Sequence, residues 1–201
     1  FGLAVTGRVT LSHLKANASA SIGAVLFLTK PLGVGMVTTA EKKGLVSKEH
    51  IASAIESMTS LNKVGEKLAE LSGVNAMTDV TGFGLMGHLL EMCQGSGTAA
   101  QIDFDEVPTL DRVALMDYHK QGCVPGGARR NFTSYGEYLD IPEGFTRDLL
   151  CDPQTSGGLL VSVEKESIDA VKEILHANSL PINIIGQILA HKEGDSIIAL
   201  K

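Results

Sequence analysis

The residues best placed to do chemistry lie in one short segment, 78–88, with the sequence TDVTGFGLMGH. Asp79 ends an apolar run, and glycines follow at positions 82, 84 and 87. Glycine lets the backbone approach a ligand closely, and the first amides of a helix offer unpaired N–H donors at the positive end of its dipole. A strand, a glycine turn and a helix start in this order suit a metal-bound phosphate, with Asp79 as a magnesium ligand.

A single carboxylate does not hold magnesium, because this cation keeps several waters and usually binds one or two carboxylates together with substrate phosphates. The rest of such a site must come from elsewhere. A glycine-rich turn between a strand and a helix is also common in α/β proteins as a simple tight turn, with an aspartate nearby as a helix cap. The spacing in segment 78–88 leaves both interpretations open.

A second segment, 149–160, has the sequence LLCDPQTSGGLL and again leads small and polar residues into an apolar strand. Together the two segments resemble the C-terminal half of the selenophosphate synthetase family, the selenide, water dikinases, within the larger aminoimidazole ribonucleotide synthetase-like superfamily. The resemblance extends almost end to end and points to a bacterial member. It also includes FGLAVTG at 1–7, LTKPLGVG at 28–35, MCQG at 92–95, VPGG at 124–127 and the pair Arg130 and Asn131.

The resemblance implies a definite reaction, in which ATP, selenide and water give selenophosphate, AMP and phosphate with the help of magnesium. Asp79 is expected to be a metal ligand because it occupies the aspartate of the family's DVTGFG motif. Thr81, Gly82 and Gly84 are expected to shape the adjacent backbone of the nucleotide site. Arg130, which follows a glycine pair, is predicted to reach a bound nucleotide as a charge-assisted donor.

Members of this family carry their reactive cysteine or selenocysteine, an essential lysine and most metal-binding aspartates in an N-terminal half. Nothing in residues 1–201 resembles that half, and the chain starts at Phe1 inside an apolar run, which also suggests a fragment. We therefore expect residues 1–201 to be one C-terminal domain of a two-domain enzyme, with no catalytic residue of its own and no activity alone. The resemblance further implies a homodimer. The cysteine pattern, which shows no paired framework, suits a reducing cytoplasm.

Three other polar positions leave alternatives open. Lys30 would meet an anion beside the glycines that follow it, or would be a solvated residue at a strand exit. Segment 152–158 would close against the nucleotide or the missing half, or would form an Asx-type turn. His88 would act as a general base or, on a helix of mostly apolar residues, as a hydrogen-bonded packing residue.

Composition excludes some classes of function. The net charge is −6 and the acidic surplus lies in the second half of the chain, so a clustered basic face for nucleic acid is not expected. The apolar runs fall short of the roughly 20 residues of a membrane-spanning helix. The three cysteines, at positions 93, 123 and 151, show neither a disulfide framework nor metal-binding spacing, and none is assigned to catalysis.

Strand-like and helix-like segments alternate along the chain, which predicts an α+β fold with a sheet covered by helices. The family resemblance adds a mixed, loosely ferredoxin-like sheet. A helix is expected from Ser47, its N-cap, with Gly44 ending the helix before it and with Ile51, Ile55 and Met58 inward. Another is expected at 166–177, and irregular structure at 118–145. Strands are expected near 3–9, 24–29, 75–80, 99–104, 158–163, 182–189 and 196–200.

Two alternatives to this function remain at the level of sequence. A related ATP-using synthetase of the aminoimidazole ribonucleotide type would share the architecture but act on a ribonucleotide. Alternatively, the chain would serve only as an association module that closes over or stabilises a catalytic partner. Nucleotide affinity of the isolated chain separates a preformed binding surface from such a module.

Overall fold

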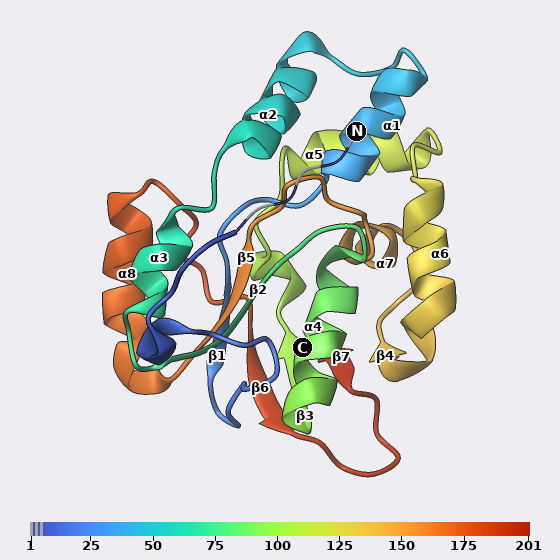
Figure 1. The fold of residues 1–201 in the computed structure, drawn as a ribbon. Helices are drawn as coiled ribbons and strands as arrows, with labels where there is room; N and C mark the ends of the chain where they lie inside the picture. The colour runs from blue at the N-terminus through green and yellow to red at the C-terminus, as the bar shows by residue number, and fades with distance from the viewer. Residues whose placement is uncertain (1, 3, 5) are drawn as a thin grey trace.

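A seven-stranded mixed sheet organises residues 2, 4 and 6–201, the part of the chain that this computed structural model describes (Figure 1). The strand order is β2-β5-β1-β6-β3-β7-β4. The four pairs from β2 to β3 are antiparallel, whereas β7 runs parallel to both β3 and β4. The strands are β1 (Val25–Leu28), β2 (Val74–Asp79), β3 (Thr98–Ile102), β4 (Leu139–Asp140), β5 (Leu159–Val163), β6 (Gly186–Ala190) and β7 (Ile198–Leu200).

Helices cover both faces of this sheet (Figure 1). On one face α3 and α8 pack over β1, β2 and β5 through a small apolar cluster that includes Phe27 and Val161. On the other face α4, α6 and α7 enclose the larger cluster, while α1, α2 and α5 lie at one end. The helices are α1 (Val34–Lys42), α2 (Lys48–Thr59), α3 (Val64–Ala69), α4 (Gly84–Ser96), α5 (Arg112–Lys120), α6 (Gly126–Tyr135), α7 (Phe145–Leu150) and α8 (Ile168–Ala177).

The α+β fold with a mixed sheet is therefore confirmed, and six of the expected strands are present. One of them starts later than expected, because β6 begins at Gly186 and not near 182. The strand expected at 3–9 is wrong for residues 4 and 6–9, which form no strand, while residues 3 and 5 lie outside the described residues. No described helix is long and apolar enough to cross a bilayer.

The predictions for the start of α2 were correct, but the prediction of its buried face was correct only in part. The Ser47 hydroxyl accepts a hydrogen bond from the His50 N–H at 3.1 Å, so Ser47 is the N-cap, and Gly44 follows α1 with a φ of +69°. The expectation that Ile55 points inward was wrong, because its exposed fraction is 49%. Helix α2 lies at the end of the molecule and packs chiefly against α1, so only a narrow stripe of it is buried.

The prediction of irregular structure at 118–145 was also wrong, since this span contains α6 and the short strand β4. Its glycines fall at helix boundaries and close contacts rather than in a loop. Gly122 follows α5 with a φ of +73°, and a Cβ on Gly127 would lie 2.9 Å from the Pro153 ring. Glycine density therefore did not indicate a long loop here.

The outer edge of β2 is covered by the chain's own N-terminal part. The Met77 N–H donates to the Ala16 carbonyl at 3.2 Å, and the Ser19 hydroxyl donates to the Asn75 carbonyl at 2.7 Å. Residues 16–19 thus occupy hydrogen-bonding groups that an edge strand otherwise presents to solvent.

Candidate functional site

Asp79 lies at the end of β2 with its side chain exposed. The position is fixed by the sheet, because Asp79 pairs with Leu159 of β5 and the next N–H, of Val80, donates to the Gly158 carbonyl at 2.8 Å. Among the described residues, no cation lies within ion-pair distance of the Asp79 carboxylate and no donor bonds to it. Its two oxygens are available to a ligand from solvent.

The turn after Asp79 combines one buried glycine and one open glycine. The Gly84 N–H donates to the Thr81 carbonyl at 3.0 Å, and Gly84 has a φ of +69°. A Cβ on Gly84 would come 2.7 Å from the carbonyl carbon of Cys151, whereas a Cβ on Gly82 would meet nothing within 4 Å. Gly84 therefore shapes the turn from the protein side, and Gly82 leaves the solvent side accessible.

His88 supports this turn from within α4. Its Nε2 accepts a hydrogen bond from the Thr81 N–H at 3.0 Å, which requires Nε2 to be unprotonated. Burial lowers the pKa of His88, against the opposing charges of Glu91 and Asp79. The packing interpretation of His88 is thus favoured over a general base, because its acceptor nitrogen already holds the turn.

Segment 152–158 was left with two interpretations, and the structure does not show the Asx-type turn, because the Asp152 carboxylate bonds to the start of α1 instead. Closure of this segment against a nucleotide or another half stays a prediction. Asp152 is fully buried, and its Oδ2 accepts hydrogen bonds from the Gly35 N–H at 2.9 Å and from Gln154 Nε2 at 2.8 Å. Its Oδ1 has no partner among the described residues. Burial raises the pKa of Asp152 to about 7, although the hydrogen bonds from Gln154 and from the Gly35 and Met36 N–H groups oppose this shift.

We predict a pH-dependent stability from Asp152. Between pH 4 and 7 the folded state keeps a proton that the unfolded state loses, so the free energy of unfolding falls by about 4 kcal/mol as pH rises through this window. Asp152→Asn stays neutral and can still accept from Gly35. Urea unfolding at pH 5, 6, 7 and 8 should show the variant gaining stability relative to the parent with rising pH, and parallel pH profiles would contradict the prediction.

The Lys30 ammonium donates all of its N–H groups to backbone carbonyls, so none is left for a phosphate. Its Nζ donates to the carbonyls of Ser57, Ser60 and Ser156 at 3.2, 2.7 and 2.7 Å, and the residue is 5% exposed. An ammonium has three N–H groups, so all are used. With Asp152 at the start of α1, the anion site considered for segment 28–35 is filled by the protein itself.

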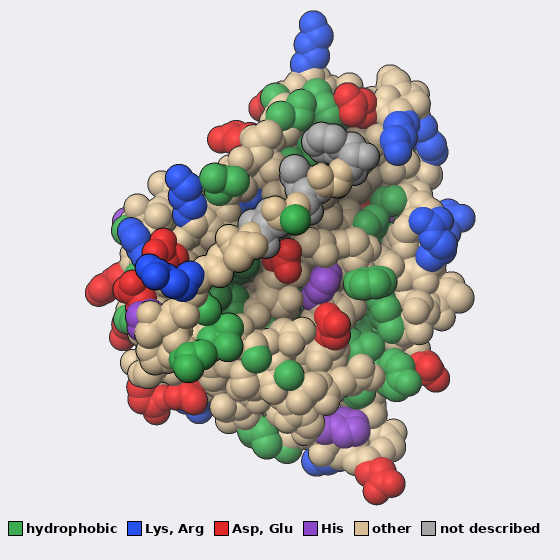
Figure 2. All heavy atoms as spheres, in the orientation of Figure 1, with side chains coloured by type: hydrophobic (Ala, Val, Ile, Leu, Met, Phe, Trp, Pro, Cys, Tyr) green, Lys and Arg blue, Asp and Glu red, His purple; other side chains and the backbone are tan. Residues whose placement is uncertain are grey.

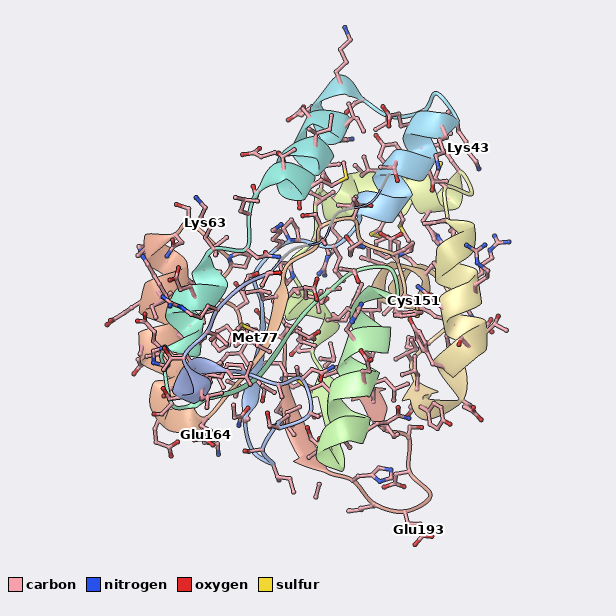
Figure 3. All side chains as sticks on the ribbon, viewed as in Figure 1. Lys43, Lys63, Met77, Cys151, Glu164 and Glu193 are labelled. Atoms are coloured by element: carbon pink, nitrogen blue, oxygen red, sulfur yellow. The ribbon has the colours of Figure 1, made fainter. Side chains whose placement is uncertain are left out.

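Helix α6 turns Asn131, not Arg130, toward the glycine turn. The Asn131 Nδ2 donates to the carbonyls of Gly82 and Cys151 at 2.9 and 3.0 Å, and Cys151 lies between α4 and α6 (Figure 3). Arg130 is exposed, and Figure 2 shows basic side chains on the outer side of α6. The structure brings Asp79 together with Thr81, Gly82 and Gly84 but leaves Arg130 outside this group. A nucleotide role for Arg130 stays a prediction.

Sequence reasoning missed Asn131 and Tyr135 as residues that hold the turn. The Tyr135 hydroxyl donates to the Phe83 carbonyl at 2.6 Å. Asn131 belongs to the segments that carry the family resemblance, which is the signal that could have found it, whereas charge favours its neighbour Arg130. Tyr135 follows Asn131 by four residues and so lies on the same face of α6.

The cysteines and the acidic residues offer no complete reactive or metal centre in the described part of the chain. Cys93, Cys123 and Cys151 are buried, and burial raises the pKa of Cys93 and of Cys151 to about 11. Among residues 2, 4 and 6–201 no group of three or more His, Cys, Asp or Glu side chains is placed to hold a metal ion. Asp79 would therefore need phosphate oxygens, water or further protein ligands to complete a magnesium shell.

Comparisons with known proteins agree on one family. The family described as AIR synthase related protein, C-terminal domain, matches residues 21–199. The selenide, water dikinase of Aeromonas hydrophila subsp. hydrophila is 56% identical over 191 residues, which cover 94% of this chain and 54% of that protein. The chain thus spans about half the length of the curated relatives it matches.

Solved structures of more distant sequence share the fold. Thiamine-monophosphate kinase from Stenotrophomonas maltophilia superimposes with a TM-score of 0.67 at 16% identity, covering 96% of this chain and 54% of that one. Hydrogenase maturation protein HypE in complex with ATP superimposes with a TM-score of 0.61 at 18% identity, covering 92% of this chain and 49% of that one. At these identities the likeness concerns the fold alone.

Proposed function

The chain belongs to the AIR synthase related protein family, as a C-terminal domain, and from this premise we propose that it is the C-terminal domain of a selenide, water dikinase. The 56% identity to a relative of that name carries the proposal. The complete enzyme makes selenophosphate from selenide, ATP and water, and releases AMP and phosphate. It is a cytoplasmic homodimer in which a preceding half supplies the reactive residues.

Within this enzyme the domain supplies one wall of the nucleotide-phosphate site. Asp79 binds magnesium, since its carboxylate is exposed and unpaired among the described residues and lies at the end of a rigid strand. When bound, magnesium neutralises phosphate oxygens and stabilises charge that develops during phosphoryl transfer. The backbone of Thr81, Gly82 and Gly84 orients the phosphates beside it, with Gly82 open to close approach.

The division of labour between the two halves is testable with the purified chain. We expect the 201-residue chain to form no AMP from ATP and selenide, because most metal ligands and the reactive residue lie in the other half. Adding that half, or using the complete enzyme, should restore AMP formation that depends on selenide, measured by chromatography of the nucleotides. Turnover by the isolated chain at the rate of the complete enzyme would overturn this division.

Two further measurements separate the alternatives. If the complete enzyme is of the aminoimidazole ribonucleotide synthetase type, ATP consumption will depend on a ribonucleotide and not on selenide. Calorimetry of the 201-residue chain with ATP and magnesium addresses the other alternative: measurable affinity supports a preformed nucleotide surface, and its absence supports an association module.

A further inference from the structure

The glycine turn is held by donors on one side only. Three consecutive carbonyls of the turn each accept a hydrogen bond from a group outside it. The bonds run from the Gln154 N–H to Thr81 O at 3.0 Å, from Asn131 Nδ2 to Gly82 O at 2.9 Å, and from the Tyr135 hydroxyl to Phe83 O at 2.6 Å. The donors come from α6 and from the segment after α7, so these carbonyls all point into the protein.

The direction of a carbonyl fixes the direction of the N–H in the same peptide unit, because the two groups of a planar trans peptide point in opposite directions. Asn131 holds the Gly82 carbonyl, so the Phe83 N–H of that peptide faces the solvent side, where Gly82 leaves open space. Within the described part of the chain, the Phe83 N–H has no backbone or side-chain acceptor.

The neighbouring peptide gives an internal comparison. Tyr135 holds the Phe83 carbonyl, but the N–H at the other end of that peptide belongs to Gly84 and already donates to the Thr81 carbonyl at 3.0 Å. Asn131 and Tyr135 therefore make similar contacts from the same helix. Of these two side chains, only Asn131 holds a peptide whose N–H is unused among the described residues and points away from the protein.

We infer that Asn131 is a positioning residue, which aims the Phe83 N–H at a phosphate oxygen of the nucleotide. This inference rests on the proposed function. Asn131 is 8% exposed, and its Nδ2 bonds to the Gly82 and Cys151 carbonyls together, so the peptide is fixed before any ligand arrives. A backbone donor fixed in advance binds an anion without ordering itself at that moment.

Steady-state kinetics of Asn131→Ser and Tyr135→Phe in the complete enzyme test the inference. Both variants lose hydrogen bonds to the turn and should lower the melting temperature. Asn131→Ser should also lower kcat/KM for ATP by about tenfold or more, because the Phe83 N–H is no longer aimed. Tyr135→Phe should change kcat/KM by less than about threefold, since the amide behind its carbonyl is internal.

A second measurement needs no destabilised variant. In the complete enzyme labelled with ¹⁵N-phenylalanine, the Phe83 amide is identified as the resonance lost in Phe83→Leu. It should move downfield on addition of ATP and magnesium, as an N–H does when it gains a charged acceptor. An unmoved resonance at saturating ATP would overturn the inference, as would equal losses of kcat/KM in the two variants or normal kcat/KM for Asn131→Ser.

Asp79→Asn, assayed beside these variants, separates the inference from the proposed function. If Asp79→Asn is inactive while Asn131→Ser retains normal kcat/KM, the magnesium site stands and only the role of Asn131 fails. If Asp79→Asn keeps full turnover, the proposed phosphate site itself is wrong.

Discussion

Asp79→Asn should abolish most magnesium-dependent turnover of the complete enzyme while leaving its melting temperature nearly unchanged. As the proposed metal ligand, Asp79 would contribute several kcal/mol in the transition state, which corresponds to a loss of about 10²-fold or more in kcat. The fold should tolerate the change within about 0.5 kcal/mol, because the side chain is exposed and unpaired within the described residues. Selenide-dependent AMP formation against magnesium concentration, with thermal unfolding in parallel, gives both quantities.

Asp140→Asn is the matched control for this experiment. Asp140 is also an exposed aspartate at the end of a strand, β4, at the opposite edge of the sheet from β2. Its loss should change neither turnover nor melting. A large fall in stability with normal kinetics for Asp79→Asn would instead support the interpretation of Asp79 as a helix cap.

Gly84→Ala should lower the free energy of unfolding by about 2 to 5 kcal/mol, combining the strain of a positive φ with overpacking against Cys151. Gly82→Ala should cost less than about 1 kcal/mol, because its Cβ would meet open space. Urea unfolding of both variants measures this difference. The two alanines lie two residues apart in one turn, so they test the turn geometry against a general intolerance of substitution.

Gly82→Ala should affect activity more than its small effect on stability suggests. If the proposed function holds, the new methyl group lies on the side from which phosphate approaches in the complete enzyme, so kcat/KM for ATP should fall although the variant stays folded. Equal stability of the two variants would contradict the described turn. Normal kcat/KM for Gly82→Ala would show that the nucleotide does not approach at this glycine.

Much of the fold could be predicted from local pattern. The run that ends at Asp79 is β2, α4 begins at Gly84, and the helix expected at 166–177 is α8. These elements combine apolar periodicity with a clear boundary residue, and both signals act within a few residues. The family resemblance supplied the mixed sheet, which periodicity does not reveal.

The roles of polar residues in the site could not be predicted in the same way, because their partners are distant in sequence. Asp152 bonds to Gly35 across 117 positions, and Lys30 bonds to Ser156 across 126. Sequence left a ligand role open for both residues, yet both side chains bond to groups inside the protein. On α6, charge favours Arg130 as the residue that reaches the site, but the neutral Asn131 contacts the turn and Arg130 is exposed.

The strip of chain at residues 16–19, which lies against β2, bears on where the domain can be cut. The family match starts at residue 21, so a version trimmed to that match would lose the strip. The bare strand would then offer its N–H and C=O groups to another molecule and invite self-association. A domain cut at the boundary of the family match would therefore lose the strip that covers β2, and expression should start upstream of residue 16.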